Sequence, residues 1–385
     1  MAVRSFAKFA VAGASVACCA LPVMAQSNVS IYGIVDLGIT SSSNGVSGVS
    51  RVTGVNSGIA NTSRLGFRGT EDLGGGLKAL FTLESSLFAD TGSFKTLSSD
   101  YASATPSAPG GVASVTPFNR RALVGLQSSS LGTLNLGRDY SPFYYAAVRM
   151  DALSASHLGN VQDVVQLSSV GSERLGSMSN SVFYTTPNWG GFVASAAYGF
   201  GSESTGADGR APKRANVSYG GSLTYSNKNL SLTAAMQDVK LPTVGGTPLQ
   251  FTGDVQTAKH YLLGGRYTSG PWFVAAGRLE FRNPMNIDGN ATLLGGGYTF
   301  GASTVLVQVQ RMELDNLSGP SKRGTVLSLA YQYELSKRTA LYAGYARVNN
   351  NESAQFAVVA ADPAFPAGAK GADPNVFAVG IRHRF

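Results

Sequence analysis

The sequence predicts an all-β protein, a closed antiparallel β-barrel of sixteen strands that crosses a membrane. Three observations predict this fold. The N-terminus has the pattern of an export signal, the remaining chain alternates apolar and polar residues with period 2, and its connections alternate between short and long. A strand turns successive side chains to opposite faces, so this alternation is typical of paired strands with one apolar and one polar face.

The N-terminal segment, residues 1–25, is predicted to be a secretory signal peptide. Arg4 and Lys8 precede a short apolar run that ends in small residues. The run is too short to span a bilayer as a helix, and cleavage is expected after the small residues. Both cysteines lie in this segment. The mature chain, 26–385, is therefore expected to have no disulfides or thiol metal ligands. No linker, composition shift or charge block divides it, so a single domain is expected.

The clearest alternation lies in TVLSLAYQYELS, residues 325–336, where Leu327, Leu329 and Tyr331 share one face and Ser328 and Gln332 the other. A half-buried strand has this pattern. Fifteen further segments resemble it, in an order typical of hairpins. The sixteen predicted strands are 28–41, 63–73, 77–87, 120–129, 132–143, 180–188, 190–200, 214–228, 229–241, 258–269, 271–282, 291–301, 303–315, 323–336, 338–351 and 375–385.

A membrane environment explains these strands better than a soluble sandwich, which rarely has sixteen strands with short turns at one end only. Lipid offers no hydrogen bonds, so a sheet within it must close. The last strand, VFAVGIRHRF, alternates up to Phe385 and has no tail. We therefore expect it to pair with the first strand, NVSIYGIVDLGIT.

Four stretches resemble the general porins of Gram-negative outer membranes, in the branch found in beta-proteobacteria. NVSIYGIVDLGI is similar to their first strand and SRLGFRGTEDLGGGLKALFTLE to their second hairpin. NRRALVGLQSSSLGTLNLGRDYSPFY resembles the next hairpin, and GIRHRF the usual ending. The likeness covers nearly all of the mature chain, in the family's order and spacing.

The resemblance implies an outer-membrane barrel with short periplasmic turns and long outer loops, assembled as a homotrimer in lipid. It implies that the third outer loop, about 144–179, folds into the lumen and narrows it. A terminal Phe385 is similar to the signal by which such barrels engage the barrel-assembly machinery. The family's loop tip is not found here, because this loop reads YYAAVRMDALSASHLGNVQDVVQLSSVGSERLG.

The resemblance also implies a basic side of the constriction, with Arg64, Arg120 and Arg138 at matching positions. Period 2 places Arg64 on the polar face of its strand but leaves the face of Arg120 open. Arg138 has the parity of Leu136, which would face lipid, where an arginine costs ~2–4 kcal/mol at the midplane. We therefore expect a bulge at Gly137 or a place near the rim. The candidates on the loop are Asp151, Asp163, Glu173 and Arg174.

These features predict a passive channel for small hydrophilic solutes and ions. Basic residues around a bore favour anions, and the formal charge of +8, or +6 without Arg4 and Lys8, suggests a mild anion preference. One alternative is a channel selective for anions or carboxylates. Another is a barrel enzyme or adhesin with His260 as a general base, but no catalytic motif is present. No cofactor, metal or nucleic acid is expected.

Overall fold

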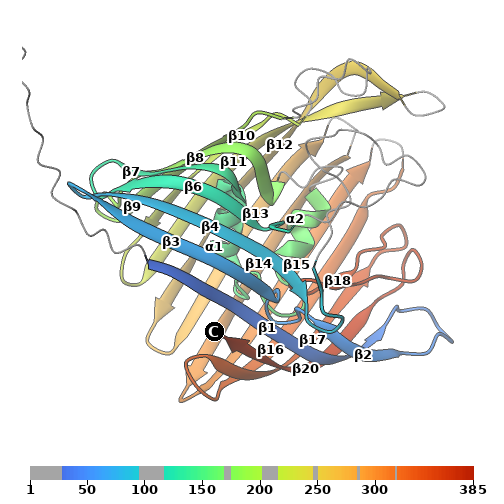
Figure 1. The fold of residues 1–385 in the computed structure, drawn as a ribbon. Coiled ribbons are helices and arrows are strands. Elements are labelled where there is room, and N and C mark those ends of the chain that lie inside the picture. Colours follow the sequence, from blue (N-terminus) through green and yellow to red (C-terminus); the bar gives the residue numbers. More distant parts are fainter. Residues whose placement is uncertain are drawn as a thin grey trace, which may run out of the picture.

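The computed structural model describes residues 28–94, 117–168, 175–201, 216–245, 250–283, 287–316 and 319–385. Within these ranges, sixteen long strands form one antiparallel sheet that closes into a barrel (Figure 1). The predicted signal peptide lies outside the described residues. The barrel strands are β1 Asn28–Ser43, β3 Arg64–Gly74, β4 Leu77–Phe88, β6 Arg121–Ser128, β7 Gly132–Tyr140, β8 Ser177–Thr185, β9 Phe192–Gly199, β10 Ser218–Ser226, β11 Leu230–Gly245, β12 Gln250–Ser269, β13 Trp272–Asn283, β14 Ile287–Phe300, β15 Ser303–Asn316, β16 Lys322–Glu334, β17 Thr339–Asn350 and β20 Asn375–Arg384.

The barrel closes through its last strand, as the sequence predicts. β20 pairs with β17 on one side and with β1 on the other, from Ile34 opposite Arg384 to Ser43 opposite Asn375. The backbone of Phe385 continues this pairing, because it exchanges two hydrogen bonds of 3.1 Å with Gly33. The backbone pairing between the last strand and the first therefore extends through Phe385.

Short elements extend the sheet at the long-loop end. β2 continues the pairing of β1, β5 pairs with β4, and β18 and β19 form a separate hairpin in the last outer loop. Their bounds are β2 Val52–Ser57, β5 Ser93–Phe94, β18 Val358–Val359 and β19 Ala364–Phe365. The structure thus has the predicted alternation of connections, with short turns at one end of the barrel and long loops at the other.

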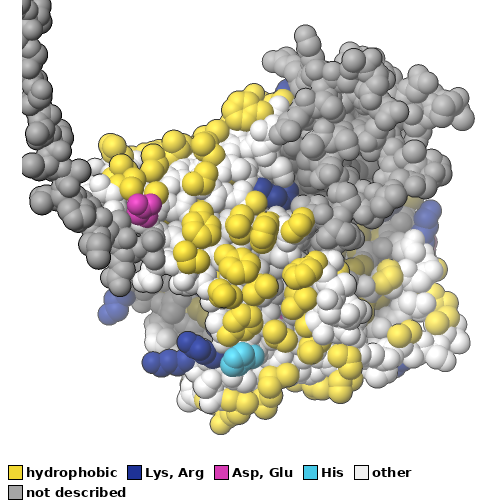
Figure 2. Space-filling model, viewed as in Figure 1, with side chains coloured by type: hydrophobic (Ala, Val, Ile, Leu, Met, Phe, Trp, Pro, Cys, Tyr) yellow, Lys and Arg dark blue, Asp and Glu magenta, His cyan; other side chains and the backbone are white. Residues whose placement is uncertain are grey.

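The outside of the barrel is apolar. In β16, Leu327, Leu329 and Tyr331 are exposed, whereas Ser328 and Ala330 between them are buried. Figure 2 shows hydrophobic side chains over much of the outer face, with few charged ones among them. Both tryptophans are exposed beside short turns. Alternation thus directs the apolar set outward, toward lipid, as expected of a transmembrane barrel.

The loop between β7 and β8 folds into the lumen and contains two helices, α1 Pro142–Met150 and α2 Gln162–Ser168. We call residues 141–176 the inward loop. The prediction placed this loop at 144–179 and extended the preceding strand to residue 143. In the structure both limits lie three residues earlier, because β7 ends at Tyr140 and β8 begins at Ser177. The strand stops before residue 143 because Pro142 begins α1 and the Ser141 hydroxyl accepts a hydrogen bond from the Tyr144 amide at 3.0 Å.

Helix α1 packs against the inner wall through residues with helical spacing, among them Phe143, Ala147 and Met150. The wall accommodates Met150 at two glycines. A Cβ on Gly277 would lie 2.2 Å from the Met150 sulfur, and one on Gly264 would lie 2.6 Å from its Cβ. Glycines inside these strands thus allow the helix to approach the sheet closely.

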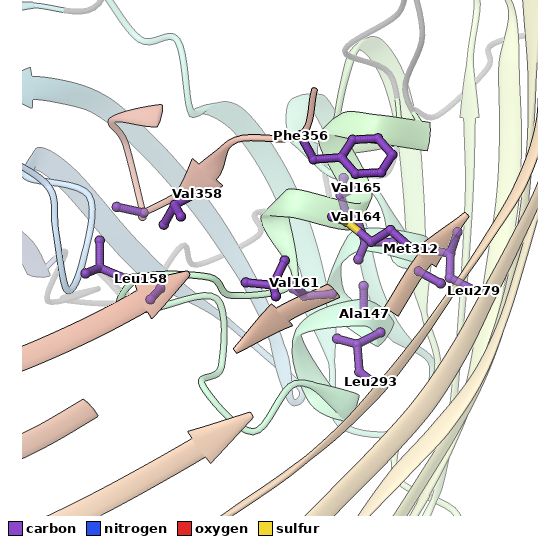
Figure 3. Packing of buried hydrophobic residues seen from close by; sticks show 14 of the residues in the cluster. Ala147, Leu158, Val161, Val164, Val165, Leu279, Leu293, Met312, Phe356 and Val358 are labelled. Carbon is purple, nitrogen blue, oxygen red and sulfur yellow. The ribbon is translucent and has the colours of Figure 1, made fainter. Parts of the chain in front are cut away.

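A hydrophobic core forms inside the barrel, where the prediction had a polar lining. Leu279, Leu293 and Met312 point inward from β13, β14 and β15 and pack against Ala147 of α1 and Val164 of α2 (Figure 3). The polar face of the strands therefore does not line the whole bore, because the inward loop covers one part of the wall. Among the described residues, no helix has the length and apolar character needed to cross a membrane.

Candidate functional site

A cavity of about 650 Å³ lies between the barrel wall and the inward loop. The three predicted arginines all line it, from β3, from the segment before β6, and from β7. The inward loop contributes residues of both helices and of the turn between them. These loop residues include Tyr144, Tyr145, Val148, Ser154, Ala155, Gln162 and Val165.

Glu84 of β4 binds two of the three arginines. Its Oε1 accepts a hydrogen bond from Nε of Arg120 at 2.6 Å and lies 3.8 Å from a terminal nitrogen of Arg64. The Tyr32 hydroxyl donates to Oε2 at 2.9 Å. Glu84 is almost fully buried, whereas Arg64 and Arg120 keep 21% and 13% of their side-chain surface exposed. The two guanidinium groups are therefore fixed beside the cavity and keep part of their surface in contact with it.

Arg138 reaches the cavity because β7 has a bulge. The register with β8 shifts between Gly137 and Asp139, and Gly137 has φ of +125°. This bulge turns the Arg138 side chain away from the lipid-facing side of the strand and into the lumen. Its Nε donates to the carbonyl of Asn119 at 2.7 Å, and a terminal nitrogen donates to the Ser179 hydroxyl at 2.5 Å. Arg138 is only 8% exposed.

Asp151 and Asp163, the two described acids of the inward loop, are not among the residues that line the cavity. Asp151 is fully buried and accepts hydrogen bonds from the backbone amides of Leu153, Ala155 and Val161. Burial raises the pKa of Asp151, and these hydrogen bonds oppose the shift. Asp163 is 5% exposed, and burial raises its pKa well above the usual value. Asp151 therefore supports the fold of the loop through its hydrogen bonds, and Asp163 is buried in α2. Glu173 and Arg174 lie outside the described residues.

Three segments that are distant in sequence meet at the rim of the cavity. The His157 amide donates to the carbonyl of Ala60, and the Gly159 amide donates to that of Val359. Thr62 joins the first segment to the last outer loop, because its hydroxyl donates to the carbonyl of Ala361 at 3.2 Å. The inward loop therefore does not narrow the bore alone. Residues 58–62 and the last outer loop complete the rim.

Asp36 of β1 holds the first of these segments. Its Oδ1 accepts the backbone amides of Ile59 at 2.9 Å and Ala60 at 3.2 Å, and Oδ2 accepts that of Asn61 at 3.2 Å. The Tyr342 hydroxyl donates to the same carboxylate at 2.9 Å. Asp36 is fully buried. This inward-facing acid in the first strand therefore fixes the backbone that carries Asn61 into the cavity lining.

Sequence reasoning missed Asp362, the carboxylate that does line the cavity with the arginines. It interacts electrostatically with both Arg64 and Arg120. It lies in the hairpin of β18 and β19, between the predicted strands 338–351 and 375–385. Arg121 lies next to Arg120, whose face the alternation left open. It turns inward and pairs with Asp139, from Nε to Oδ1 at 3.0 Å.

His260, the candidate general base, is buried between the barrel wall and α1. It is 3% exposed, and its ring packs against Phe143 of α1 and Phe281 of β13. His157 is buried near Tyr342, and burial lowers its pKa to about 4. The described residues hold no group of three or more His, Cys, Asp or Glu side chains arranged to bind a metal ion.

A closed barrel with an apolar outside and a narrowed bore lined by charged side chains defines a membrane channel. The comparisons with known proteins agree with this class. The model of the Gram-negative porin family matches residues 10–353, and the chain belongs to that family. It is a channel of the outer membrane that lets small hydrophilic solutes and ions diffuse passively.

The chain is similar to named porins over almost its whole length. It is 31% identical to the outer membrane porin protein 32 of Delftia acidovorans, over 94% of this chain and 95% of that one. An outer membrane porin protein of Bordetella pertussis is 28% identical, with the same coverage. The solved anion-selective porin of Comamonas acidovorans superposes with a TM-score of 0.76 at 28% identity, over 94% of this chain and all of that one.

Proposed function

We propose that the constriction gives this channel a mild preference for small anions, with Arg64, Arg120 and Arg138 as its basic side. One observation supports this proposal above the others. Among the described residues, three guanidinium groups and one carboxylate, that of Asp362, line the cavity. The similar porin from Comamonas acidovorans is described as anion-selective, which agrees with this assignment.

The physical basis is the field of these charges in a narrow, water-filled bore whose wall has a low dielectric constant. Guanidinium groups stay ionised at any working pH, so the positive side does not titrate away. Glu84 lies behind Arg64 and Arg120 and reduces their effective charge without removing it. A modest excess of positive potential results. It attracts anions and leaves the passage of small cations possible.

The test is the zero-current potential across a planar bilayer that separates unequal KCl concentrations. Purified protein should form steady channels, with a potential whose sign shows that chloride passes more readily than potassium. A potential of the opposite sign would contradict the anion preference and leave the channel function intact. The absence of conductance from folded protein would contradict both.

A channel selective for small carboxylates is a second candidate. Tyr140 stacks on Tyr144 with ring centroids 4.8 Å apart, and the Arg120 guanidinium lies 5.5 Å from the Tyr140 ring. A guanidinium beside aromatic rings favours a planar carboxylate over chloride. Current that saturates with carboxylate concentration, or chloride current that a carboxylate blocks, would favour this candidate. A linear dependence favours the general channel.

We also propose the assembly that the family resemblance implies, a homotrimer inserted by the barrel-assembly machinery through the strand that ends in Phe385. We assign no catalytic activity. OmpT of Vibrio cholerae, solved in a trimer form, shares the fold with a TM-score of 0.62 at 14% identity. Light scattering of the detergent-solubilised chain measures the assembly, and a monomer mass would contradict the trimer.

A further inference from the structure

The outer face of β13–β16 carries a row of arginine and threonine side chains at one level. Arg278 lies opposite Thr292, Thr292 opposite Arg311, and Arg311 opposite Thr325 in the registers of the successive strand pairs. We call these four residues the arginine row. Arg278, Thr292 and Arg311 are exposed on the face that carries the apolar band, and Thr325 is half-buried.

The row next toward the short turns is apolar. Ala276, Leu294, Val309 and Leu327 are partners in the same registers, and the last three are exposed by 63%, 41% and 39%. The arginine row is thus the first charged row above the lipid-facing band. A ligand that reaches it from outside would rest its apolar part on Leu294 and Val309.

The level of the arginine row corresponds to lipid headgroups. Exposed aromatic rings of Tyr298 and Phe300 mark the short-turn end of β14. From Phe300 to Thr292 the strand rises about 26 Å at ~3.3 Å per residue, or roughly 20 Å along the barrel axis at a tilt of 35–45°. The apolar band of such barrels is ~25 Å tall. The row therefore lies near the band's outer edge, where the polar groups of the outer leaflet begin.

The two arginines differ in their partners. Arg278 donates from Nε to Glu280 at 2.8 Å and from a terminal nitrogen to the Thr292 hydroxyl at 3.2 Å. Glu313, on the strand of Arg311, is instead paired with Arg323 at 2.6 Å. Within the described part of the chain, no hydrogen bond or ion pair to the Arg311 guanidinium is found. Arg311 is thus an exposed cation at a lipid boundary, with a hydroxyl and a second arginine beside it.

We infer that the arginine row binds the phosphate group of an outer-leaflet lipid, with the acyl chains on the apolar row below. Neighbouring strands lie ~4.8 Å apart, so Arg278 and Arg311 are separated by about 10 Å and both reach a phosphate above Thr292. A guanidinium donates two parallel hydrogen bonds to a phosphate, and the contact is stronger at the edge of a low-dielectric layer than in water. The charge of a lipid phosphate complements that of the row.

Native mass spectrometry of the full chain in a non-ionic detergent tests this inference. The probes are bisphosphorylated hexa-acyl lipid A and the same lipid with both phosphates removed. Wild-type protein should retain the phosphorylated form preferentially. The double variant Arg278→Gln/Arg311→Gln should bind it about tenfold more weakly, because both guanidinium contacts to phosphate are lost.

The matched control is Lys337→Gln/Arg338→Gln, which removes two positive charges from an exposed turn at the opposite end of the barrel. It should bind lipid A as the wild type does. Unchanged single-channel conductance of both variants shows that the barrel is folded, since all four residues lie outside the bore. Equal retention by the Arg278/Arg311 variant and the wild type would overturn the inference. So would equal binding of the two lipids, or displacement of lipid A by inorganic phosphate at equal concentration.

Discussion

Arg120 donates from Nε to Oε1 of Glu84 at 2.6 Å, between the segment that precedes β6 and the adjacent strand β4. Under the proposed assignment, this pair reduces the charge that the basic side presents to a passing ion. Glu84 also lies 3.8 Å from Arg64, so one buried carboxylate partly neutralises two guanidinium groups. The proposed selectivity therefore depends on acids as well as on arginines.

Replacing Glu84 with Gln is expected to strengthen the anion preference. A unit charge about 7 Å from a permeating ion contributes roughly 0.6 kcal/mol in water, which corresponds to about a threefold change in the permeability ratio. The zero-current potential in a KCl gradient measures this ratio. A shift toward potassium would contradict the assignment, and Glu84→Asp, which keeps the charge, is the control.

The single changes Arg64→Ala and Arg120→Ala are each expected to shift the zero-current potential toward cation preference. The chloride-to-potassium permeability ratio should fall by about the factor given for Glu84. Each removes a cavity-lining charge and leaves Glu84 with one partner fewer. Arg338→Ala, at an exposed turn, removes the same charge far from the cavity and should change little. If neither cavity variant moves the potential, the basic-side assignment is wrong.

Asp362→Asn and Asp163→Asn are expected to differ in their effect on ion selectivity. Asp362 lines the cavity, so its loss should raise the chloride preference about as much as the loss of Glu84. Asp163 is buried and its raised pKa favours the neutral acid, so its change to Asn should leave selectivity unchanged. The same KCl measurement separates the two. The opposite ranking would restore the inward loop as the source of the acidic side.

Gly137→Ala is expected to destabilise the barrel by about 1–3 kcal/mol, because Gly137 has φ of +125° and a Cβ there would lie 2.2 Å from the Ala122 carbonyl oxygen. The strain should also displace Arg138. Thermal unfolding in detergent measures the stability, and the KCl potential reports the displaced charge. Gly344→Ala is the matched control, since its nearest neighbour would be the Leu329 carbonyl oxygen at 3.6 Å. Equal stability of the two variants would count against a strained bulge.

The stability contributed by α2 is expected to fall as pH rises. Burial raises the folded-state pKa of Asp163, so the folded chain holds a proton that the unfolded chain releases. This contribution is largest below the unfolded pKa of ~3.9 and decreases as pH rises toward the folded pKa. Between the unfolded pKa and the folded pKa of Asp163, the unfolding temperature should fall with rising pH more steeply for the wild type than for Asp163→Asn. Parallel pH profiles would show that Asp163 is not the group responsible.

The sequence alone determined the barrel, because the direction of a strand side chain depends on parity, which is a local property. Alternation in residues 325–336 identified the apolar side chains that face outward. Alternation that continues to Phe385 predicted the pairing of β20 with β1. Local rules also predicted the bulge at Gly137. An arginine that faces lipid costs free energy, and the glycine next to Arg138 allows a bulge that turns the side chain inward.

Only the tertiary structure decided what lines the constriction. The rim joins segments as distant as Thr62 and Ala361, which are 299 residues apart, and no local pattern encodes that contact. The inward loop folds as helices on an apolar patch of wall, and this packing buries Asp151 and Asp163 and leaves Asp362 at the cavity. Parity tells whether a side chain faces the lumen. Whether another segment then covers it depends on long-range packing.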